Sequence, residues 1–296
     1  MSIRIDRLLV SAQWFRRLAL IICALPLANC GGDGGDGTGI DDVVDPGLPA
    51  AITDGQWYRP TVAVTWQWQL QGDVNTGYSV DLYDIDLFDS PATLIQELQA
   101  AGRRVICYFS AGSFEPFRSD ASSFQPAELG SVLEGFSDER WLDVRSSNVL
   151  EIMKGRLDLA VQKGCDGVEP DNMDGYQNPS GFPLTAGDQL LFNRRIANEA
   201  HLRNLTVGLK NDLDQIATLL AYYDFSVNEQ CHEFTECDLL TPFVTDGKPV
   251  FNAEYAAVFV NDAAERARIC TRSGVLNLRT LILPLDLDDS FRLSCD

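Results

Sequence analysis

Three carboxylates crowd one short segment of this sequence, CDGVEPDNMDGY, which spans residues 165–176. Glu169, Asp171 and Asp174 follow a short apolar approach and are interleaved with proline, asparagine and glycine. Like charges at this spacing raise one another's pKa, and acid/base chemistry is commonly arranged in this way. The spacing does not match an EF-hand loop, which argues against a calcium site. The segment therefore predicts acid/base chemistry at the end of a strand.

The remaining sequence narrows the kind of chemistry. It contains no GxSxG elbow, P-loop, Rossmann fingerprint or CxxC pair, and its only histidines are His201 and His232. These absences argue against a zinc site and against a histidine-based nucleophile relay. What remains is paired carboxylates with aromatic and amide side chains, the usual equipment for glycoside hydrolysis. We therefore expect a hydrolase that needs neither a cofactor nor a metal.

The elements that must position these acids alternate between apolar, β-branched runs and amphipathic segments. Eight runs resemble strands: residues 61–70, 83–89, 104–110, 167–169, 205–210, 224–228, 249–255 and 278–285. Five segments between them have helical spacing: residues 91–101, 149–160, 192–200, 212–223 and 261–270. A long stretch after the third strand is expected to be a loop. This order predicts a (β/α)8 TIM-type barrel, with a doubly wound sheet as the alternative.

Polar residues stand where each predicted strand ends, and active sites of such barrels lie at the carboxyl ends of the strands. The candidates for substrate binding or catalysis are Trp66, Asp84, Asp86, Tyr108, Ser110, Glu169, Asp171, Asp174, Lys210, Asn228, Glu229 and Glu254. Aspartate and asparagine are also common helix caps after strands, and Asp212 and Asp262 are expected to be only that. The concentration of polar groups over successive strand ends carries the prediction.

The aromatic candidates are suited to stack on sugar rings. Trp66, Trp68, Tyr108 and Trp141 offer ring faces, while asparagine and aspartate side chains can bond hydroxyl groups. The alternative for each aromatic residue is packing in the core.

The charged candidates have two interpretations each. Asp84, Asp86 and Glu254 could supply a negative field for a cationic ligand, or could form hydrogen bonds within the barrel rim. Lys210 could lower the pKa of a neighbouring carboxylate, or could belong to a simple buried ion pair.

The N-terminus predicts export. Residues 1–29 combine a basic start with an apolar stretch over residues 18–28, which is too short to span a bilayer as a permanent helix. The junction resembles a lipoprotein signal with Cys30 as the lipid-bearing residue, although Asn29 departs from that pattern. An ordinary signal peptide or an uncleaved anchor is the alternative. Residues 30–52 are expected to be a Gly/Asp-rich linker, and residues 53–296 the catalytic domain.

Charge and cysteine content agree with an exported enzyme. Removal of residues 1–29, which carry four arginines and one aspartate, changes the formal charge from −20 to −23. Such a surface argues against nucleic acid and would attract cations. Apart from Cys30, six cysteines remain, an even number suited to disulfides in an oxidising compartment. Cys231 with Cys237 and Cys270 with Cys295 are expected to pair, while Cys107 and Cys165 either pair or stay as buried thiols.

The sequence resembles a known family over about residues 55–285. The matching segments are WQWQL (66–70), YDIDLFD (83–89), CYFSAGSFE (107–115), WLDVR (141–145), DGVEPDNMD (166–174), LKND (209–212), SVNEQC (226–231) and FNAEY (251–255). Together they resemble glycoside hydrolase family 114, whose founding activity is endo-α-1,4-polygalactosaminidase. The resemblance implies a (β/α)8 barrel with an acidic pair after the fourth and sixth strands, here Asp171 and Glu229.

The resemblance implies a role for each acid. Asp171 precedes Asn172, as at the nucleophile position of α-galactosidase-type barrels, which makes Asp171 the expected nucleophile and Glu229 the general acid/base of a retaining mechanism. Glu169 is the rival nucleophile, and Asp174 is expected to bond sugar or cap the next turn.

The implied partner is a polysaccharide that contains α-1,4-linked galactosamine. The alternatives are another α-galactoside or exopolysaccharide, or a non-catalytic glycan-binding lipoprotein. We expect a monomer that meets no nucleic acid and touches membrane only through a possible lipid anchor.

Overall fold

The computed structural model describes residues 48–296. The predicted signal peptide over residues 1–29, the lipidation site Cys30 and most of the linker over residues 30–52 lie outside the described residues. Within residues 48–296, the helices are all too short or too polar to cross a membrane.

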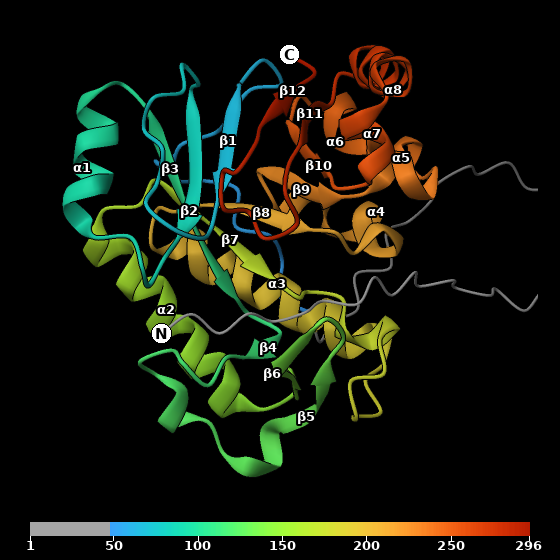
Figure 1. Cartoon of the computed structure of the whole chain (residues 1–296). Helices are drawn as coiled ribbons and strands as arrows, with labels where there is room; N and C mark the ends of the chain where they lie inside the picture. Colours follow the sequence, from blue (N-terminus) through green and yellow to red (C-terminus); the bar gives the residue numbers. More distant parts are fainter. Residues whose placement is uncertain (1–47) are drawn as a thin grey trace, which may run out of the picture. The chain divides into compact units, whose positions relative to one another are not determined.

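Eight parallel strands form the central sheet (Figure 1). In spatial order they are β1 (Trp66–Gln69), β2 (Leu82–Asp86), β3 (Arg104–Ser110), β7 (Gly167–Asp171), β8 (Thr206–Lys210), β9 (Phe225–Glu229), β10 (Val250–Glu254) and β11 (Arg279–Ile282). The short strand β12 (Leu293–Ser294) pairs with β11 in the antiparallel sense. Each parallel strand matches one of the eight predicted runs, and the order is that of the predicted barrel.

The C-terminal segment bridges the first and last parallel strands. In the described part of the chain, β1 and β11 share no ladder of backbone hydrogen bonds. Instead, the backbone N–H groups of Leu70 and Gln71 donate to the Leu287 carbonyl at 3.0 and 3.2 Å. The Arg292 guanidinium donates to the Trp66 carbonyl at 2.9 Å. The sheet therefore closes through side chains and a returning segment.

Helices follow most strands and cover the outside of the sheet (Figure 1). They are α1 (Ala92–Ala100), α2 (Ser147–Lys163), α3 (Ala186–Leu202), α4 (Ile216–Leu219), α5 (Cys231–Phe234), α6 (Thr241–Thr245), α7 (Ala257–Asn261) and α8 (Ala263–Leu276). Six short 3-10 helices accompany them: η1 (Ala121–Ser123), η2 (Pro126–Glu128), η3 (Gly175–Gln177), η4 (Leu213–Gln215), η5 (Leu220–Tyr222) and η6 (Cys237–Leu240). The predicted helix over residues 212–223 is thus three short pieces.

Helix starts follow ordinary capping chemistry in three cases. The Ser146, Thr185 and Asp262 side chains accept backbone N–H groups at the starts of α2, α3 and α8. The prediction that Asp262 is a cap is therefore confirmed. Asp212 precedes η4, but its side chain makes no capping hydrogen bond, so the cap prediction was wrong there.

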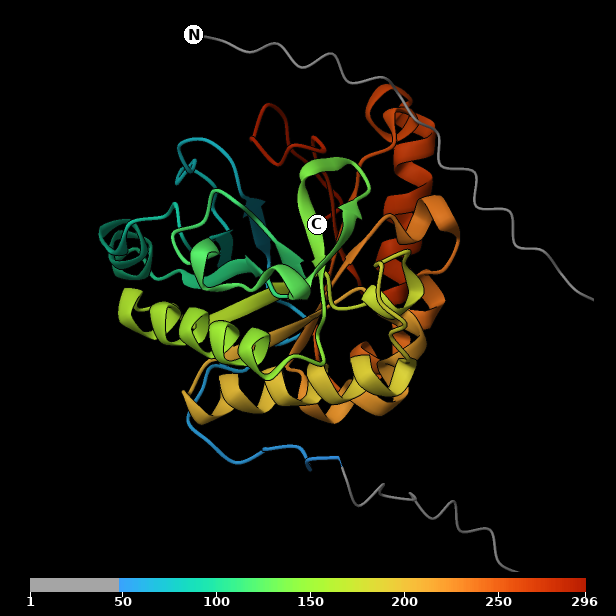
Figure 2. The same cartoon turned by 90° about the horizontal axis from the view of Figure 1, so that it is seen from below.

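A second, three-stranded antiparallel sheet lies where a loop was predicted. It contains β4 (Ser113–Phe114), β6 (Phe136–Leu142) and β5 (Leu129–Leu133), in that spatial order. Figure 2 views the molecule from the side on which this sheet lies, with the β5–β6 hairpin in front. The insertion begins three residues after β3, so it stands at the carboxyl end of the barrel.

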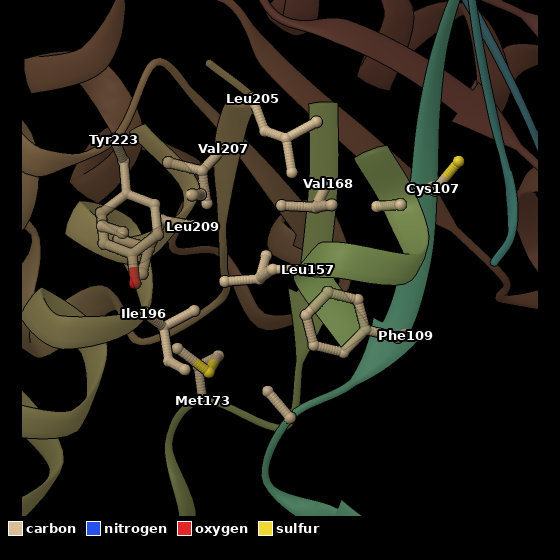
Figure 3. Packing of buried hydrophobic residues seen from close by; sticks show 14 of the residues in the cluster. Cys107, Phe109, Leu157, Val168, Met173, Ile196, Leu205, Val207, Leu209 and Tyr223 are labelled. Atoms are coloured by element: carbon tan, nitrogen blue, oxygen red, sulfur yellow. The ribbon is translucent and has the colours of Figure 1, made fainter. Parts of the chain in front are cut away.

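Side chains alternate between two apolar layers along each parallel strand. One layer packs between the strands and helices α2 and α3, and Figure 3 shows residues of it, among them Phe109, Val168 and Val207. The other layer includes Trp66, Trp68, Phe225 and Phe251, which point to the opposite face and fill the barrel interior.

Three disulfides fasten the described chain: Cys107–Cys165, Cys231–Cys237 and Cys270–Cys295. The first joins β3 to the turn before β7, the second closes a six-residue separation after β9, and the third ties the C-terminus to α8. The two predicted pairings are confirmed, and Cys107 and Cys165 pair rather than remaining thiols.

Candidate active site

Lys210 is the cation at the centre of the acidic cluster. It ends β8, and its side chain is 2% exposed. Its Nζ lies 3.1 Å from Asp171 Oδ1, 3.4 Å from Glu229 Oε2 and 3.3 Å from Glu169 Oε1. Burial alone would lower the pKa of Lys210, but these three acids together raise it well above its ordinary value. Lys210 therefore remains charged and holds carboxylates of three different strand positions together.

Asp171 ends β7 with both carboxylate oxygens engaged. The Tyr108 hydroxyl donates to Oδ2 at 3.0 Å, and the Asn172 backbone N–H donates to Oδ1 at 2.6 Å. Burial and the Asp171 charge raise the pKa of Tyr108 well above its ordinary value, so its hydroxyl keeps the proton that it donates. The Asp171 side chain is 18% exposed. This donor set suits an anionic nucleophile with a fixed orientation.

A tight turn fixes the residue after Asp171. Asn172 has a φ of 60°, and its side-chain amide donates to Ser110 Oγ at 2.9 Å. A Cβ on Gly112 would lie 1.8 Å from the Asn172 carbonyl oxygen, so the two segments approach closely only because residue 112 is glycine. Ser110 is fully buried and its hydroxyl also pairs with that of Ser113 at 2.7 Å. Ser110 therefore positions Asn172, and its contact with substrate stays a prediction.

Glu229 ends β9 and is held from two neighbouring strands. The Tyr255 hydroxyl donates to its Oε1, and its own backbone N–H donates to Asn211 Oδ1 at 3.0 Å. Asn228 donates to the same Asn211 oxygen at 3.2 Å and is 1% exposed. Asn228 therefore supports Asn211, and its contact with substrate stays a prediction. The Glu229 side chain is 27% exposed, which leaves it accessible at the barrel mouth.

Asp84 and Glu169 lie below this accessible pair. They are 1% and 0% exposed, and a direct contact of either with substrate stays a prediction. Burial raises the pKa of Asp84 to about 7, and burial followed by the Asp84 charge raises the pKa of Glu169 well above its ordinary value. Both side chains belong to the inward-facing set of their strands, with Tyr108 on the strand between them.

Asp86 belongs to an ion-pair network that holds the insertion. The Arg118 guanidinium lies 2.6 Å from the Asp86 carboxylate and 2.9 Å from that of Glu115. The backbone N–H groups of Phe88 and Asp89 also donate to Asp86, each at 2.8 Å. The Asp86 side chain is 5% exposed and its oxygens accept these hydrogen bonds, and its contact with substrate stays a prediction.

Trp66 and Glu254 also lie away from the mouth. Trp66 is fully buried in the barrel interior, where its indole N–H donates to the Arg279 carbonyl at 2.9 Å. Glu254 is fully buried on the outer face of β10 and accepts the His232 backbone N–H at 2.8 Å. Successive side chains of a strand point to opposite faces, so its neighbour Ala253 faces inward instead. Substrate contacts by Trp66 and Glu254 stay predictions, which their burial does not favour.

Two further acids extend the cluster, Asp174 from the segment after β7 and Asp212 from the segment after β8. Burial, then the Asp171 charge, raises the pKa of Asp174 to about 6. Burial, then the Asp174 charge, raises the pKa of Asp212 to about 8. Asp212 accepts the Asn193 side-chain amide at 2.9 Å and the Tyr176 hydroxyl at 3.3 Å. Asp174 keeps its predicted position beside Asp171, whereas sequence reasoning missed Asp212.

The insertion brings one acid that sequence reasoning missed entirely. Glu139 on β6 accepts the Ser113 hydroxyl at 2.7 Å, and burial, followed by the charges of Glu115 and Asp171, raises its pKa to about 7. The alternation of FSDERWL, residues 136–142, could have placed Glu139 on the same strand face as Trp141. Tyr255 was missed as well, because it follows β10 and lies outside the strand-end pattern.

The fold and the site together define a barrel enzyme that presents two partly exposed carboxylates at the carboxyl end of its strands. The chain belongs to glycoside hydrolase family GH114, whose model matches residues 48–296. The protein is therefore a glycoside hydrolase that acts on O-glycosidic bonds, and the family resemblance in the sequence is confirmed.

Solved structures agree with this assignment. Ega3 from Aspergillus fumigatus, crystallised in complex with galactosamine, is 40% identical, with a TM-score of 0.77 over 84% of this chain and 100% of that chain. The glycoside hydrolase domain of PelA from Pseudomonas aeruginosa is 12% identical, with a TM-score of 0.61 over 78% of this chain and 98% of that chain. The latter likeness concerns the fold alone. The predicted barrel class is confirmed.

A sequence relative adds no activity. A protein of Deinococcus radiodurans, described as uncharacterized, is 27% identical over 255 residues, which cover 71% of this chain and 79% of the relative.

Proposed function

We propose that this glycoside hydrolase cleaves α-1,4-linked, galactosamine-containing polysaccharide by a retaining mechanism, with Asp171 as nucleophile and Glu229 as general acid/base. The observation that carries the proposal is the arrangement of two partly exposed carboxylates around one buried lysine. Asp171 and Glu229 reach solvent, and the Lys210 ammonium lies within ion-pair distance of both. Binding alone requires no such pair, which favours catalysis over a glycan-binding role.

The spacing of the pair favours retention. Asp171 Oδ1 and Glu229 Oε2 lie 3.1 and 3.4 Å from the same Lys210 nitrogen, so these two oxygens are at most the sum of those distances, 6.5 Å, apart. Retaining enzymes hold their carboxyl groups about 5–5.5 Å apart, whereas inverting enzymes need about 6.5–9.5 Å to admit a water molecule. The upper bound therefore supports direct attack by one of the two acids.

Each carboxylate has a distinct step. Asp171 attacks the anomeric carbon while Glu229 gives its proton to the departing glycosidic oxygen, so one C–O bond forms as another breaks. The Glu229 carboxylate then takes a proton from water, and the resulting oxygen attacks the same carbon and releases Asp171. Tyr108 and Asn172 hold Asp171, while Tyr255 and Asn211 hold Glu229.

Burial separates Asp171 from its rival. The Glu169 side chain is 0% exposed, whereas that of Asp171 is 18% exposed. A nucleophile must reach within about 3–3.5 Å of the anomeric carbon, and a fully enclosed carboxylate cannot do so. This difference supports Asp171 as the nucleophile.

The acidic rim supports an amine-bearing sugar. Ega3, which is 40% identical, was crystallised with galactosamine, and the mouth of this barrel is lined by Asp174, Glu139 and the proposed catalytic pair. Carboxylates favour ammonium groups and accept hydrogen bonds from sugar hydroxyls. Asp174 and Glu139 are therefore the proposed contacts of the substrate, with the Tyr108 ring beside them.

The exported state is also a proposal. Three disulfides in the described chain are suited to an oxidising compartment, and they support export through residues 1–29. The proposed lipid attachment at Cys30 rests on the resemblance of the sequence around it to a lipoprotein signal. The enzyme is proposed to act as a monomer without a cofactor or a metal.

Oligosaccharide release from defined galactosamine polymers tests the function. Release by the wild-type protein that disappears in both Asp171→Asn and Glu229→Gln variants would support the proposal. Unchanged release by Asp171→Asn would exclude that residue as the nucleophile. Cleavage of other α-galactosides but not of galactosamine polymer would change the substrate, and tight binding without release would indicate a glycan-binding protein.

A further inference from the structure

Two buried acids beneath the active site have no role in the mechanism above. Asp84 on β2 and Glu169 on β7 are 1% and 0% exposed, and β3 lies between their strands. Their carboxyl groups are close enough to interact as a hydrogen-bonded pair. Among the described residues, no N–H or O–H group donates a conventional hydrogen bond to any of their four oxygens. The ion pair of Glu169 with Lys210, at 3.3 Å, is the exception to their isolation.

Two such carboxyl groups cannot both be ionised at neutral pH. Contact between like charges in a water-excluded site strongly favours one protonated and one ionised group, which then share a hydrogen bond. Burial raises the pKa of both acids in agreement with this requirement.

Lys210 links this pair to the reacting groups. Its ammonium lies 3.3 Å from Glu169, 3.1 Å from Asp171 and 3.4 Å from Glu229, and 4.8 Å from the ring centre of Trp68 on β1. The remaining ionisable groups that face the pair are Tyr108 on β3 and Tyr255 after β10, both held as neutral phenols. The charge of the pair is therefore balanced by one lysine, which also serves the two acids above it.

We propose that Asp84 and Glu169 are positioning residues that hold one proton between them. Their single negative charge attracts Lys210 and so weakens the interaction of Lys210 with Asp171 and Glu229. This inference rests on the proposed roles of Asp171 and Glu229. When that one charge is lost, the Lys210 ammonium interacts with the carboxylates of Asp171 and Glu229 alone. Glu229 then gives up its proton more readily and is less available as a general acid at alkaline pH.

Amide variants distinguish a shared proton from two independent charges. Asp84→Asn and Glu169→Gln each keep one hydrogen bond and one negative charge, because the remaining acid ionises. In the Asp84→Asn/Glu169→Gln protein the two amides can still hydrogen-bond to each other, but the negative charge is gone. We expect the alkaline limb of the kcat/KM–pH profile to stay near its wild-type position in each single variant. In the double variant it moves to lower pH by about 1 unit. Asp166→Asn, at the opposite end of the Glu169 strand, is the control and leaves the limb in place.

Three outcomes would overturn the proposal. They are a shift in either single variant as large as in the double variant, no shift in the double variant, and an equal shift in the Asp166→Asn control.

A second measurement applies if the double variant does not fold or if the polymer is not a substrate. Carbon-13 NMR of the wild-type side-chain carboxyls, followed from about pH 5 to about pH 9, reports the protonation of Asp84 and Glu169 directly. One proton held by the pair at about pH 6 supports the inference. Two ionised groups throughout the range would contradict it, whatever the enzyme's substrate. Absence of polymer cleavage by the wild-type protein would instead reject the proposed function and leave the pair to this test.

Discussion

The two ends of the barrel surround their buried acids with different numbers of hydrogen-bond donors. At the amino end of the strands, Asp224 accepts hydrogen bonds from the Trp57 indole at 3.0 Å and from the Thr206 hydroxyl at 3.0 Å. The Val207 backbone N–H donates at 3.1 Å, and His201 Nε2 lies 3.0 Å away. This carboxylate is fully compensated by its neighbours.

At the carboxyl end, acids outnumber the groups that compensate them. Lys210 is shared by Glu169, Asp171 and Glu229, and among the described residues Asp84 has another acid, Glu169, as its hydrogen-bond partner and interacts with the same Lys210 charge. Burial of incompletely paired charges costs stability, so a protein gains nothing structural from this arrangement. Burial alone therefore does not distinguish a functional acid from a structural one in this molecule. The functional acids lie where carboxylates outnumber the groups that compensate their charge.

The largest expected effect separates the two ends by activity. Glu229→Gln removes the general acid, and we expect kcat/KM on galactosamine polymer to fall by about 10³-fold or more, with a similar loss in Asp171→Asn. Both changes relieve repulsion among the mouth acids, so the thermal midpoint should stay the same or rise. Initial rates and thermal unfolding on the same samples check this. A large fall in the midpoint would mean that these acids are structural.

The next effect separates the two ends by stability. Asp224→Asn leaves donors at the base of the barrel without a charged acceptor, and we expect the free energy of unfolding to fall by about 3 kcal/mol. The activity of the folded fraction should persist, because the substitution lies at the end opposite to the site. Urea unfolding together with kcat/KM measures both quantities. Unchanged stability in Asp224→Asn would contradict the structural role of Asp224.

A smaller effect concerns the groups that orient the pair. Tyr255→Phe removes the hydroxyl that donates to Glu229, and a hydrogen bond to a charged group contributes about 1.5–3 kcal/mol. We expect kcat to fall about tenfold or somewhat more, with little change in KM. The pH profile provides the sharper test, since a change in packing alone would leave its limbs in place.

The smallest effect is a gentle dependence of stability on pH. Burial raises the pKa of Asp84, Glu139 and Glu254 to about 7 and that of Asp212 to about 8, whereas the same groups ionise near pH 4 when the chain is unfolded. The unfolded chain therefore binds fewer protons, and stability falls as pH rises through these values. His232, whose pKa is lowered to about 4 in the folded protein, is neutral there at neutral and alkaline pH. Above its unfolded value of about 6.5 it is mostly neutral in the unfolded chain as well, so it adds little to this dependence.

Thermal midpoints from about pH 6.5 to about pH 8.5 should thus decline in the wild-type protein. The decline should be shallower in Asp212→Asn, which lacks one of the titrating mouth acids. A midpoint that rises over this range would contradict the charge states assigned to the mouth.

Much of the barrel could be predicted from the sequence because its strands are short, apolar and followed by polar residues. The same pattern brought Asp171, Lys210 and Glu229 together correctly, since parallel strands place their carboxyl ends at one edge. The pattern could not show that the Asp86 and Glu254 side chains are engaged away from the exposed pair, for different reasons. Glu254 stands one residue out of phase with the inward face of β10, whereas Asp86 is occupied by Arg118, which lies in a distant part of the sequence.

The insertion was harder to predict. Its strand β4 has only two residues, β5 is partly exposed, and the pairing of β5 with β6 contains register irregularities. Local sequence patterns are weak in such segments, and contacts with the barrel decide their structure. The place of Glu139 beside the site therefore depends on a tertiary contact, the hydrogen bond from Ser113, which the local sequence does not predict.

The most direct test of the account compares one acid from each end. It measures the initial rate of oligosaccharide release per folded molecule in Asp171→Asn and Asp224→Asn, under conditions where both proteins are folded. We predict that Asp171→Asn loses release by about 10³-fold or more, whereas Asp224→Asn stays close to the wild type. Release retained by Asp171→Asn, or an equal loss in both proteins, would contradict the claim that the acids at the barrel mouth have a catalytic rather than a structural role.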